Sequence, residues 1–505
     1  MPSIPSLLIA VTSAFAFAVA TASEPSEAWS MFGRDLQNTH HYPQQTGSNY
    51  KMVWSKRAGC PAPGMAATLV TDMGMFNTSP CSNSGDTHAT SLEGEELWAN
   101  SVGQGKRGII ATPCFHDGTL YSIDNGFIKA FDAKDGALKW KEEVKCGKVS
   151  IASPIAYEGV IFLSGTTGIQ VTQIDRAKSA QDTVIEVEDC HGASTPAFHD
   201  GSMVALALQR VHCFDVMTLK PIWQVDLSEK VVGRLINSPI IDIENGRVFV
   251  ASSHPYRTEG RLHCLSLKDG EILWQQDIDG IGMTSGMSFD GKQLFVASMK
   301  GTVSAHDVDN GKAIWKWSLP GENQTEGNKV DHKRKLDGLI SSKNKLLFRT
   351  SSRFYIISND HPDQIDFELD LGVYGASTPA FYDGDLFIRY RPKDSKATNF
   401  RYTEIKQAAA PKAEDLEVKI VKNVAHIRNL SQTKLNFYQL CFGINVNEKQ
   451  NCMLWESELQ PGAEMELDLE QFFPVDDQLH HLLLALEYEK PDGTGKFQEY
   501  FTINP

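Results

Sequence analysis

Six stretches of the chain place a basic or polar residue shortly before an apolar segment, and together these residues could bind an anion. The stretches read "QGKRGIIATP", "CGKVSIASP", "CHGASTP", "VVGRLINSP", "HKRKLDGL" and "GVYGASTP". The residues are Arg107, Lys148, His191, Arg234, Lys335 and Tyr374. Converging Arg and Lys side chains attract a carboxylate, a phosphate or an acidic sugar. The alternative is that they pair with nearby Asp and Glu residues around a rim, and the sequence leaves both interpretations open.

The composition makes such a cluster unexpected, because the chain as a whole is acidic. Its 505 residues carry a net charge of −15, with 41% hydrophobic and 22% charged residues. This balance is ordinary for a globular protein with a real core. It argues against a nucleic-acid or anionic-membrane surface, which needs clustered Lys and Arg. The length suits several domains or one large closed array of repeats.

A repeated phrase places the six residues at equivalent positions. It consists of Ser/Thr-Pro, a few apolar residues, Asp-Gly and an apolar strand, as in "ATPCFHDGTLYSI" and "STPAFHDGSMVAL". The eight anchors of the clear and degenerate copies are Thr68, Pro113, Pro154, Pro196, Pro239, Gly286, Gly338 and Pro379. Their spacing of roughly 41 to 52 residues is typical of a four-stranded propeller blade. The loop before each inner strand then points at the mouth of a central channel.

Most copies end in a tryptophan on the fourth strand. These residues are Trp98, Trp140, Trp223, Trp274 and Trp315. We predict that each ring packs between neighbouring blades as part of the core. The eighth copy lacks this strand, and "YKMVWSKRAG" near the amino terminus supplies an equivalent one with Trp54. That strand would complete the last blade and close the ring, which removes exposed sheet edges.

These repeats resemble the PQQ-like β-propeller family, which includes quinoprotein dehydrogenases and the BamB-type outer-membrane assembly scaffold. The resemblance rests on the Ser/Thr-Pro…Asp-Gly strands, the "Ala-Phe-Asp…Asp-Gly…Trp" phrases and the opening "WSMFGRDLQNTHHY". It implies an all-β fold: an eight-bladed β-propeller of four-stranded antiparallel blades, which we assign to residues 23–407. It implies less about activity, because the same repeats serve enzymes, scaffolds and sensors.

The residues that quinone chemistry uses in this family mostly do not carry over. Quinone-dependent dehydrogenases usually have two adjacent cysteines, and no two of the nine cysteines here are adjacent. The haem motif C-x-x-C-H is absent, and we find no convincing Glu, Asn and Asp set for a calcium site. The histidines form no metal motif. We therefore expect no cofactor, and PQQ with calcium only if the chain is an oxidoreductase after all.

The two ends of the chain differ from the repeats. The stretch "LLIAVTSAFAFAVATAS" is apolar and ends in Ala20-Thr21-Ala22 before Ser23. This pattern predicts a signal peptide at residues 1–22, with an uncleaved anchor as the alternative. The mature protein would be secreted or periplasmic and would not span a membrane. Residues 408–505 follow the linker "KQAAAPKAEDLE" and suggest about seven short strands, which favours a small immunoglobulin-like β-sandwich.

Cysteine spacing suggests three disulfides but cannot establish them. The pairs are Cys60 with Cys81, Cys146 with Cys190, and Cys441 with Cys452. Cys114, Cys213 and Cys264 replace alanines of sister blades, so we expect buried free thiols there.

Three functions remain open from the sequence. The leading hypothesis is a non-catalytic binding or scaffold protein that recognises a protein partner or an anionic small molecule at the channel mouth. The second is a quinone-dependent oxidoreductase, with the cations holding the carboxylates of the quinone. The third is a polysaccharide-handling accessory protein, which the sandwich favours. We therefore regard enzymatic activity as uncertain and a binding role as the better interpretation.

Overall fold

The computed structural model shows an all-β chain. It describes residues 28–57, 66–78, 86–101, 111–124, 126–176, 182–235, 237–254, 258–282, 286–320, 334–360, 362, 365–371, 376–392, 398–404, 416–421, 424–430, 434–444, 451–468, 482–489 and 496–503. The predicted signal peptide lies outside these residues. Within them there is no helix with the length and apolar character needed to cross a membrane.

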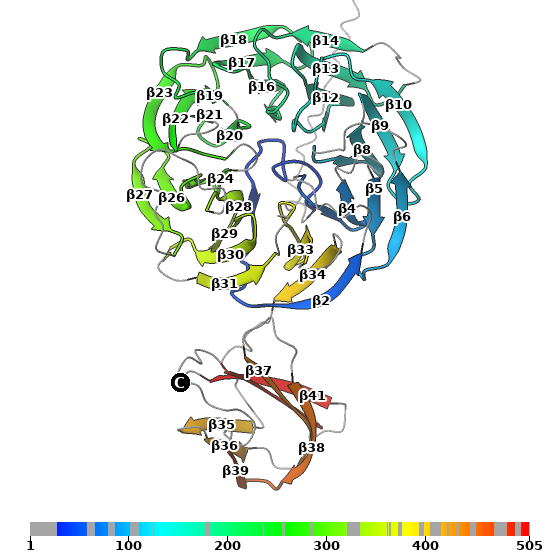
Figure 1. Ribbon diagram of the computed structural model, residues 1–505, viewed down its shortest axis with the longest axis vertical. Coiled ribbons are helices and arrows are strands. Elements are labelled where there is room, and N and C mark those ends of the chain that lie inside the picture. Colours follow the sequence, from blue (N-terminus) through cyan, green and yellow to red (C-terminus); the bar gives the residue numbers. More distant parts are fainter. Residues whose placement is uncertain are drawn as a thin grey trace, which may run out of the picture.

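The described residues from 28 to 404 form eight sheets around a common centre (Figure 1). We number them one to eight in chain order. Sheets one to four are β3 (Leu69–Thr71), β4 (Gly74–Thr78), β5 (Asp86–Thr90) and β6 (Glu96–Ser101); β7 (Cys114–His116), β8 (Thr119–Asp124), β9 (Phe127–Asp132) and β10 (Leu138–Glu143); β11 (Ile155–Tyr157), β12 (Val160–Ser164), β13 (Gly168–Gln173) and β14 (Thr183–Glu186); and β15 (Ala197–His199), β16 (Ser202–Leu206), β17 (Arg210–Asp215) and β18 (Pro221–Asp226).

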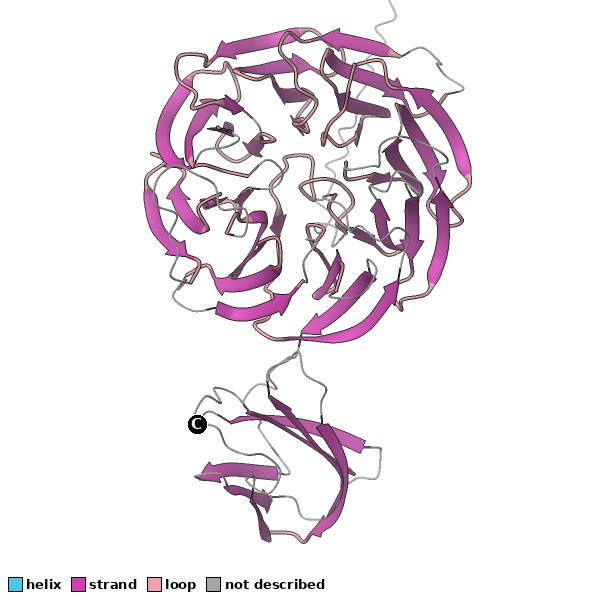
Figure 2. Cartoon of the chain, viewed as in Figure 1, coloured by secondary structure: helices cyan, strands magenta, loops and turns pink. Residues whose placement is uncertain are grey.

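The other four sheets follow the same order. They are β19 (Arg234–Leu235), β20 (Ile240–Asp242), β21 (Arg247–Ser253), β22 (Glu259–Ser266) and β23 (Ile272–Asp279); β24 (Met287–Phe289), β25 (Gln293–Ala297), β26 (Thr302–Asp307) and β27 (Ala313–Ser318); β28 (Asp337–Ser342), β29 (Lys345–Arg349), β30 (Arg353–Ser358) and β31 (Ile365–Asp370), with β1 (His41–Tyr42); and β32 (Ala380–Tyr382), β33 (Asp385–Tyr390), β34 (Thr398–Glu404) and β2 (Tyr50–Arg57). Each sheet runs from a short inner strand to an outer strand at the rim (Figures 1 and 2).

The Asp-Gly pairs turn the inner hairpins, as predicted. In sheet two, Asp117 and Gly118 both have positive φ, at 45° and 66°. In sheet four, Asp200 and Gly201 have 44° and 72°. Positive φ at both central residues defines the two-residue turn whose twist matches the flanking strands. The phrase therefore encodes the same hairpin in successive sheets.

The Ser/Thr of the repeated Ser/Thr-Pro phrase joins neighbouring sheets by hydrogen bonds. The amide of Thr112 donates to Ser153 Oγ at 3.0 Å, and the amide of Ser153 donates to Thr195 Oγ1 at 3.0 Å. The series continues at both ends, from the amide of Ala67 to Thr112 Oγ1 and from the amide of Thr195 to Ser238 Oγ, both at 2.9 Å. We call this series the hydroxyl belt. Its members are buried, so each hydroxyl satisfies an amide that water does not reach.

Replacing Ser153 by Ala should therefore weaken the contact between sheets two and three. The change leaves the buried amide of Thr112 without an acceptor, and we expect the free energy of unfolding to fall by about 1 to 3 kcal/mol. Ser150→Ala, at an exposed serine in the same loop, should change it by less than about 0.5 kcal/mol. Chemical denaturation of both variants measures the difference. Equal stabilities would show that the belt contributes nothing.

The tryptophans at the ends of the outer strands each reach the next sheet. The indole N–H of Trp98 donates to the carbonyl oxygen of Ala133 at 2.9 Å, and that of Trp274 donates to Val308 at 2.8 Å. Trp54 and Trp223 make the same bond to Leu92 and Leu267. A glycine of the next sheet lies against each of these four rings. At Gly136, φ is +73° and an added Cβ would lie 2.6 Å from Trp98, so a larger residue does not fit there.

A β-bulge precedes the aromatic residue in seven of the eight outer strands. The register shifts by one residue before Trp54, Trp98, Trp140, Trp223, Trp274, Trp315 and Phe367. In β14 the register with β13 has no shift, and the strand has no aromatic residue. A bulge twists an edge strand and interrupts its regular row of backbone groups. Sheet three is therefore the exception among the eight.

The ring closes as predicted from the position of Trp54. Strand β2 pairs with β34 from Tyr50 opposite Glu404 to Arg57 opposite Thr398, and so completes sheet eight. Sheet eight also meets sheet one, because the amide of Thr68 donates to the carbonyl oxygen of Thr378 at 3.0 Å.

The residues before β2 cross the centre of the ring and satisfy the free edges of the inner strands. We call residues 28–49 the opening segment. Its carbonyl oxygens accept amides from six sheets, at 2.7 to 3.1 Å: Trp29 from Val70, Ser30 from Phe115, Leu36 from Phe198, Gln37 from Ile241, Thr39 from Phe289, and His40 from Ser341. Each donor lies in the last pair of its inner hairpin or one residue before it. The segment thus lies at the hairpin end of the inner strands.

The described residues after the linker form two further sheets. One contains β35 (Leu416–Val421), β36 (Val424–Asn429) and β39 (Glu464–Asp468); the other contains β37 (Leu435–Ile444), β38 (Asn451–Leu459), β40 (Leu482–Glu489) and β41 (Lys496–Ile503). These are the seven strands that the sequence predicts. Leu416, Ala425, Ile427, Leu435 and Phe437 are buried.

Candidate functional site

The loops that precede the inner strands lie at the end of the ring away from the opening segment. Each inner strand begins at the hydroxyl belt and ends, about three residues later, at the opening segment. At a rise of about 3.3 Å per residue, these two levels are roughly 10 Å apart. One end of the centre is therefore occupied by the chain itself, and a ligand of the predicted mouth would arrive from the other end. Arg107 and Tyr374 lie outside the described residues.

Lys148 is exposed on a loop whose backbone is well held. Its amide donates to Thr166 Oγ1 at 2.9 Å, and its carbonyl oxygen accepts the amide of Thr166 at 3.0 Å. The amides of Ser150, Ile151 and Ala152 all point at the carbonyl oxygen of Gly192, at 2.8 to 3.2 Å. The loop of sheet three is thus fixed to the loop of sheet four, next to His191.

His191 and Arg234, from the loops of sheets four and five, lie close enough to interact. Burial lowers the pKa of His191, and the positive charge of Arg234 lowers it further, whereas the backbone of Leu235 opposes the shift. Its Nδ1 accepts the amide of Ala193 at 3.2 Å. The imidazole is therefore a neutral group at pH 7, and Arg234 supplies the charge of this pair.

The sequence position of Arg234 suggests a plain loop, but the structure differs. Arg234 belongs to the short strand β19, where it is paired with Ser253 of β21. Its side chain remains exposed. Lys148, Arg234 and Lys335 form no ion pair with another described residue, and both interpretations of these cations stay open.

Lys335 lies beside a buried carboxylate. A Cβ placed on Gly282 would be 3.3 Å from Lys335 Cε and 3.5 Å from Asp337 Oδ1. Asp337 is paired with Arg349 in the register of β28 and β29. Burial lowers the pKa of Arg349, and Asp337 opposes this shift. Lys335 and the buried Asp337 thus both lie near Gly282.

Two buried arginines, in sheets seven and eight, were missed from the sequence. Arg349 and Arg389 lie at equivalent positions of β29 and β33, two residues after Leu347 and Phe387, which pair with Ile340 and Ala380. They are 7% and 0% exposed, and Arg389 Nη1 lies 2.8 Å from His88 Nε2 of sheet one. The signal was an arginine that ends an apolar strand, in "KLLFRT" and "DLFIRY". Buried guanidinium groups add positive potential to the interior of these two sheets.

The cysteines divide into three outcomes. Cys146 and Cys190 are buried free thiols, so the disulfide predicted between them is absent from the structure. Cys114, Cys213 and Cys264 are free and buried as predicted. Burial raises the pKa of these three thiols, to about 12, 11 and 12, which makes them unreactive.

The remaining cysteine pairs stay predictions. Cys60 and Cys81 lie outside the described residues. The backbone register places Cys441 directly opposite Cys452 in β37 and β38.

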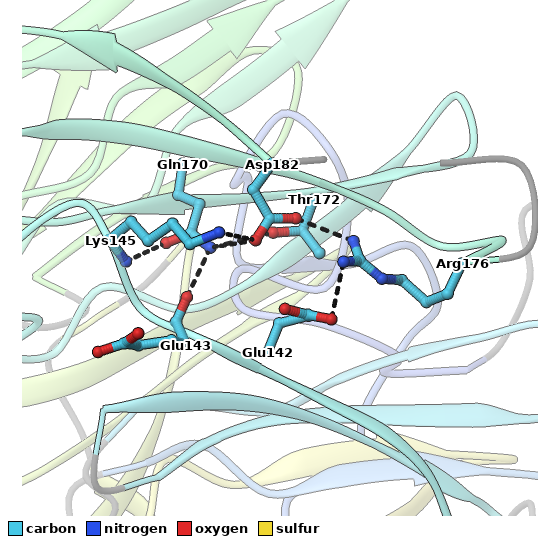
Figure 3. A network of polar contacts seen from close by, with 7 residues as sticks. All are labelled: Glu142, Glu143, Lys145, Gln170, Thr172, Arg176 and Asp182. Carbon is cyan, nitrogen blue, oxygen red and sulfur yellow. Dashed lines mark hydrogen bonds and ion pairs between the residues drawn. The ribbon is translucent and has the colours of Figure 1, made fainter. Parts of the chain in front are cut away.

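A separate ionic cluster joins sheets two and three (Figure 3). Asp182, whose side chain is fully buried, accepts Arg176 Nη1 at 2.9 Å and Lys145 Nζ at 3.1 Å. Arg176 also binds Glu142 at 2.7 Å, and its guanidinium group lies 5.9 Å from the centre of the Trp140 ring. Against Trp54, Trp98, Trp223 and Trp274 the next sheet places a turn glycine, whereas Trp140 faces Arg176 of this cluster. It is a structural junction, and its charges are internally paired.

Comparison with known proteins shows which proteins have similar repeats. A profile of the family described as "Outer membrane protein assembly factor BamB" matches residues 84–182 and 258–353. This match and the relatives below support PQQ-like repeats in this chain. Outer membrane protein assembly factor BamB of Escherichia coli (strain K12) is 28% identical over 193 residues, which are 36% of this chain and 45% of that protein. Quinohemoprotein alcohol dehydrogenase ADH IIB of Pseudomonas putida is 28% identical over 143 residues, which are 26% of this chain and 20% of that protein.

A solved structure supports the same β-propeller fold. The crystal structure of BamB from Moraxella catarrhalis has a TM-score of 0.51 and 15% identity, and the match covers 71% of this chain and 98% of that one. This likeness concerns the fold. The matches to this chain span less than half the length of the Escherichia coli protein and of the dehydrogenase, so the activities of those proteins do not follow for this chain.

Proposed function

We propose that this PQQ-like repeat protein is a non-catalytic binding or scaffold protein, secreted or periplasmic, that recognises an acidic protein segment or an anionic small molecule at the channel mouth. Residues 23–407 would form an eight-bladed propeller, and residues 408–505 an immunoglobulin-like domain. The observation that carries the proposal is the exposure of Lys148 and Arg234, without described ion-pair partners, at the end of the ring opposite the opening segment. The similarity to an outer membrane protein assembly factor supports a protein partner.

The described residues do not provide the groups that the alternative, a quinone-dependent oxidoreductase, would use. No two cysteines are adjacent in the sequence. The described residues also contain no group of three or more His, Cys, Asp or Glu side chains arranged to hold a metal ion. Arg349 and Arg389 would suit carboxylates, but they are buried in the sheets. We therefore assign the mouth to binding and derive no redox step.

Replacing both Lys148 and Arg234 by Ala should weaken binding of an acidic peptide, for which we suggest a labelled oligoglutamate. Each lost charged hydrogen bond should cost about 1 to 3 kcal/mol, and the loss should shrink at high salt because both groups are partly solvated. Fluorescence anisotropy at low and high salt measures this. The matched control is Lys268→Ala with Lys312→Ala, which removes the same charge from exposed turns. Equal binding by both double variants would refute the mouth site.

A further inference from the structure

The outer edge of β14 is the one regular strand edge at the rim among the eight described sheets. The other seven outer strands carry a bulge next to an aromatic residue. β14 pairs with β13 without a shift, from Gly168 opposite Glu186 to Val171 opposite Thr183. Regular edges are templates for an added strand, and bulges are a common protection against this. Sheet three lacks that protection.

The backbone groups that face outward can be assigned from the register. The amide of Val187 donates to the carbonyl oxygen of Thr167 at 3.3 Å. In an antiparallel pair, residues that exchange hydrogen bonds alternate with residues that do not. Ile185 and Thr183 therefore bond to β13, and the amides and carbonyls of Val184 and Glu186 point away from it. Neither of these two residues has another backbone partner within the described part of the chain.

The charges along β14 favour a basic occupant. At its amino-terminal end, Asp182 is neutralised by Arg176 and Lys145 (Figure 3). At its other end, Glu186 is exposed and makes no ion pair with a described residue. Glu188, which follows, is already bound by Arg210 at 2.9 Å. Glu186 is thus the uncompensated charge of the edge.

We propose that the edge of β14 is a docking surface for an extended segment of a partner protein, which adds as a fifth strand and places a Lys or Arg opposite Glu186. Main-chain hydrogen bonds to Val184 and Glu186 provide affinity in this mode, and side chains of the added strand provide specificity. The half-buried Val184 and Ile185 offer apolar contacts on the two faces of the strand. This surface lies at the rim and does not depend on the proposed mouth site.

The test is a selection from a displayed library of random peptides. Peptides that bind the full mature chain are kept, and those that also bind the Val184→Pro variant are removed. Proline at this position removes an outward amide and leaves the bonds to β13 intact. The selected peptides should alternate β-branched with basic residues and should slow hydrogen exchange at Val184 and Glu186 by at least about tenfold. Glu186→Lys should weaken their binding by about tenfold or more, whereas the control Glu229→Lys, at another exposed site, should not.

Three outcomes would overturn the proposal. One is a selection in which no peptide distinguishes the native chain from a folded Val184→Pro variant. Another is peptides that bind and leave both amides exchanging at their free rate. The third is self-association of the native chain that Val184→Pro abolishes, because it would assign the edge to a second copy. If Val184→Pro does not fold, exchange at the two amides and the Glu186→Lys comparison decide the question alone.

Discussion

Removing residues 28–57 should abolish the cooperative thermal unfolding of the ring. The truncated chain loses β2 and with it the outer strand of sheet eight. It also loses the carbonyl oxygens that accept amides from six inner strands. Each buried amide left without a partner costs about 1 to 3 kcal/mol, and the sum over six amides, about 6 to 18 kcal/mol, is as large as the 5 to 15 kcal/mol by which proteins are typically stable. Circular dichroism during heating should show aggregation or a broad transition, and a native-like transition would show that the ring does not close through Trp54.

A single residue of the opening segment allows a finer test. Asn38 is 1% exposed, and its Nδ2 donates to the carbonyl oxygens of Thr195, Pro196 and Pro239 at 3.1 to 3.2 Å. Its φ is +56°, which glycine tolerates and alanine does not. Asn38→Gly should therefore isolate the lost hydrogen bonds, at about 1 to 3 kcal/mol, and Asn38→Ala should cost about 1 to 2 kcal/mol more.

The repeated architecture was predictable because it depends on side-chain types at a fixed spacing. Ser/Thr-Pro marks the hydroxyl belt, Asp-Gly marks the inner hairpin, and tryptophan marks the contact between sheets. The contacts of the opening segment were not predictable. Its "WSMFGRDLQNTHHY" signals the family, but the groups that it binds are backbone amides, which have no signature in the sequence.

The site was predicted less completely for a related reason. Loop positions selected Lys148, His191, Arg234 and Lys335, and the positive charge of Arg234 lowers the pKa of His191. Arg349 and Arg389 escaped notice because an arginine after an apolar run is usually the exposed end of a strand. Their burial depends on partners in sheets distant in the chain, such as His88 for Arg389. The bulges in the outer strands likewise depend on pairing register, which spacing alone does not determine.

Acid should destabilise the protein well above the pH at which carboxylates protonate. Burial lowers the pKa of His40, His212 and His263 to about 4. In the unfolded chain each of these histidines binds a proton near pH 6.5. The unfolded state therefore takes up protons first, and the stability present above pH 6.5 is lost as the pH falls toward 4. One fully buried histidine such as His40 should account for about 3 kcal/mol of this loss.

Other groups titrate in a different window or in the opposite direction. Hydrogen bonds lower the pKa of Asp215 and Asp226, so these carboxylates destabilise the fold only below about pH 4. Burial raises the pKa of Asp35, and its protonation therefore adds stability as the pH falls. Burial also lowers the pKa of His41 to about 4, and it lowers the pKa of His191 and His306. Six described histidines therefore lower the stability as the pH falls from 6.5 toward 4, against the opposing effect of Asp35, so we expect a net loss.

Urea unfolding of the native chain and of His40→Asn at several pH values measures the histidine contribution. His40 has a φ of +51°, a conformation that asparagine tolerates, so the variant removes the titrating ring with little backbone strain. The native chain should lose stability from pH 6.5 to 4, and the variant should lose less, by up to about 1.4 kcal/mol per pH unit. Parallel pH profiles would mean that His40 is protonated in the folded chain. The buried imidazole would then carry a positive charge in the folded chain, and Asp337 is the carboxylate that could stabilise this charge.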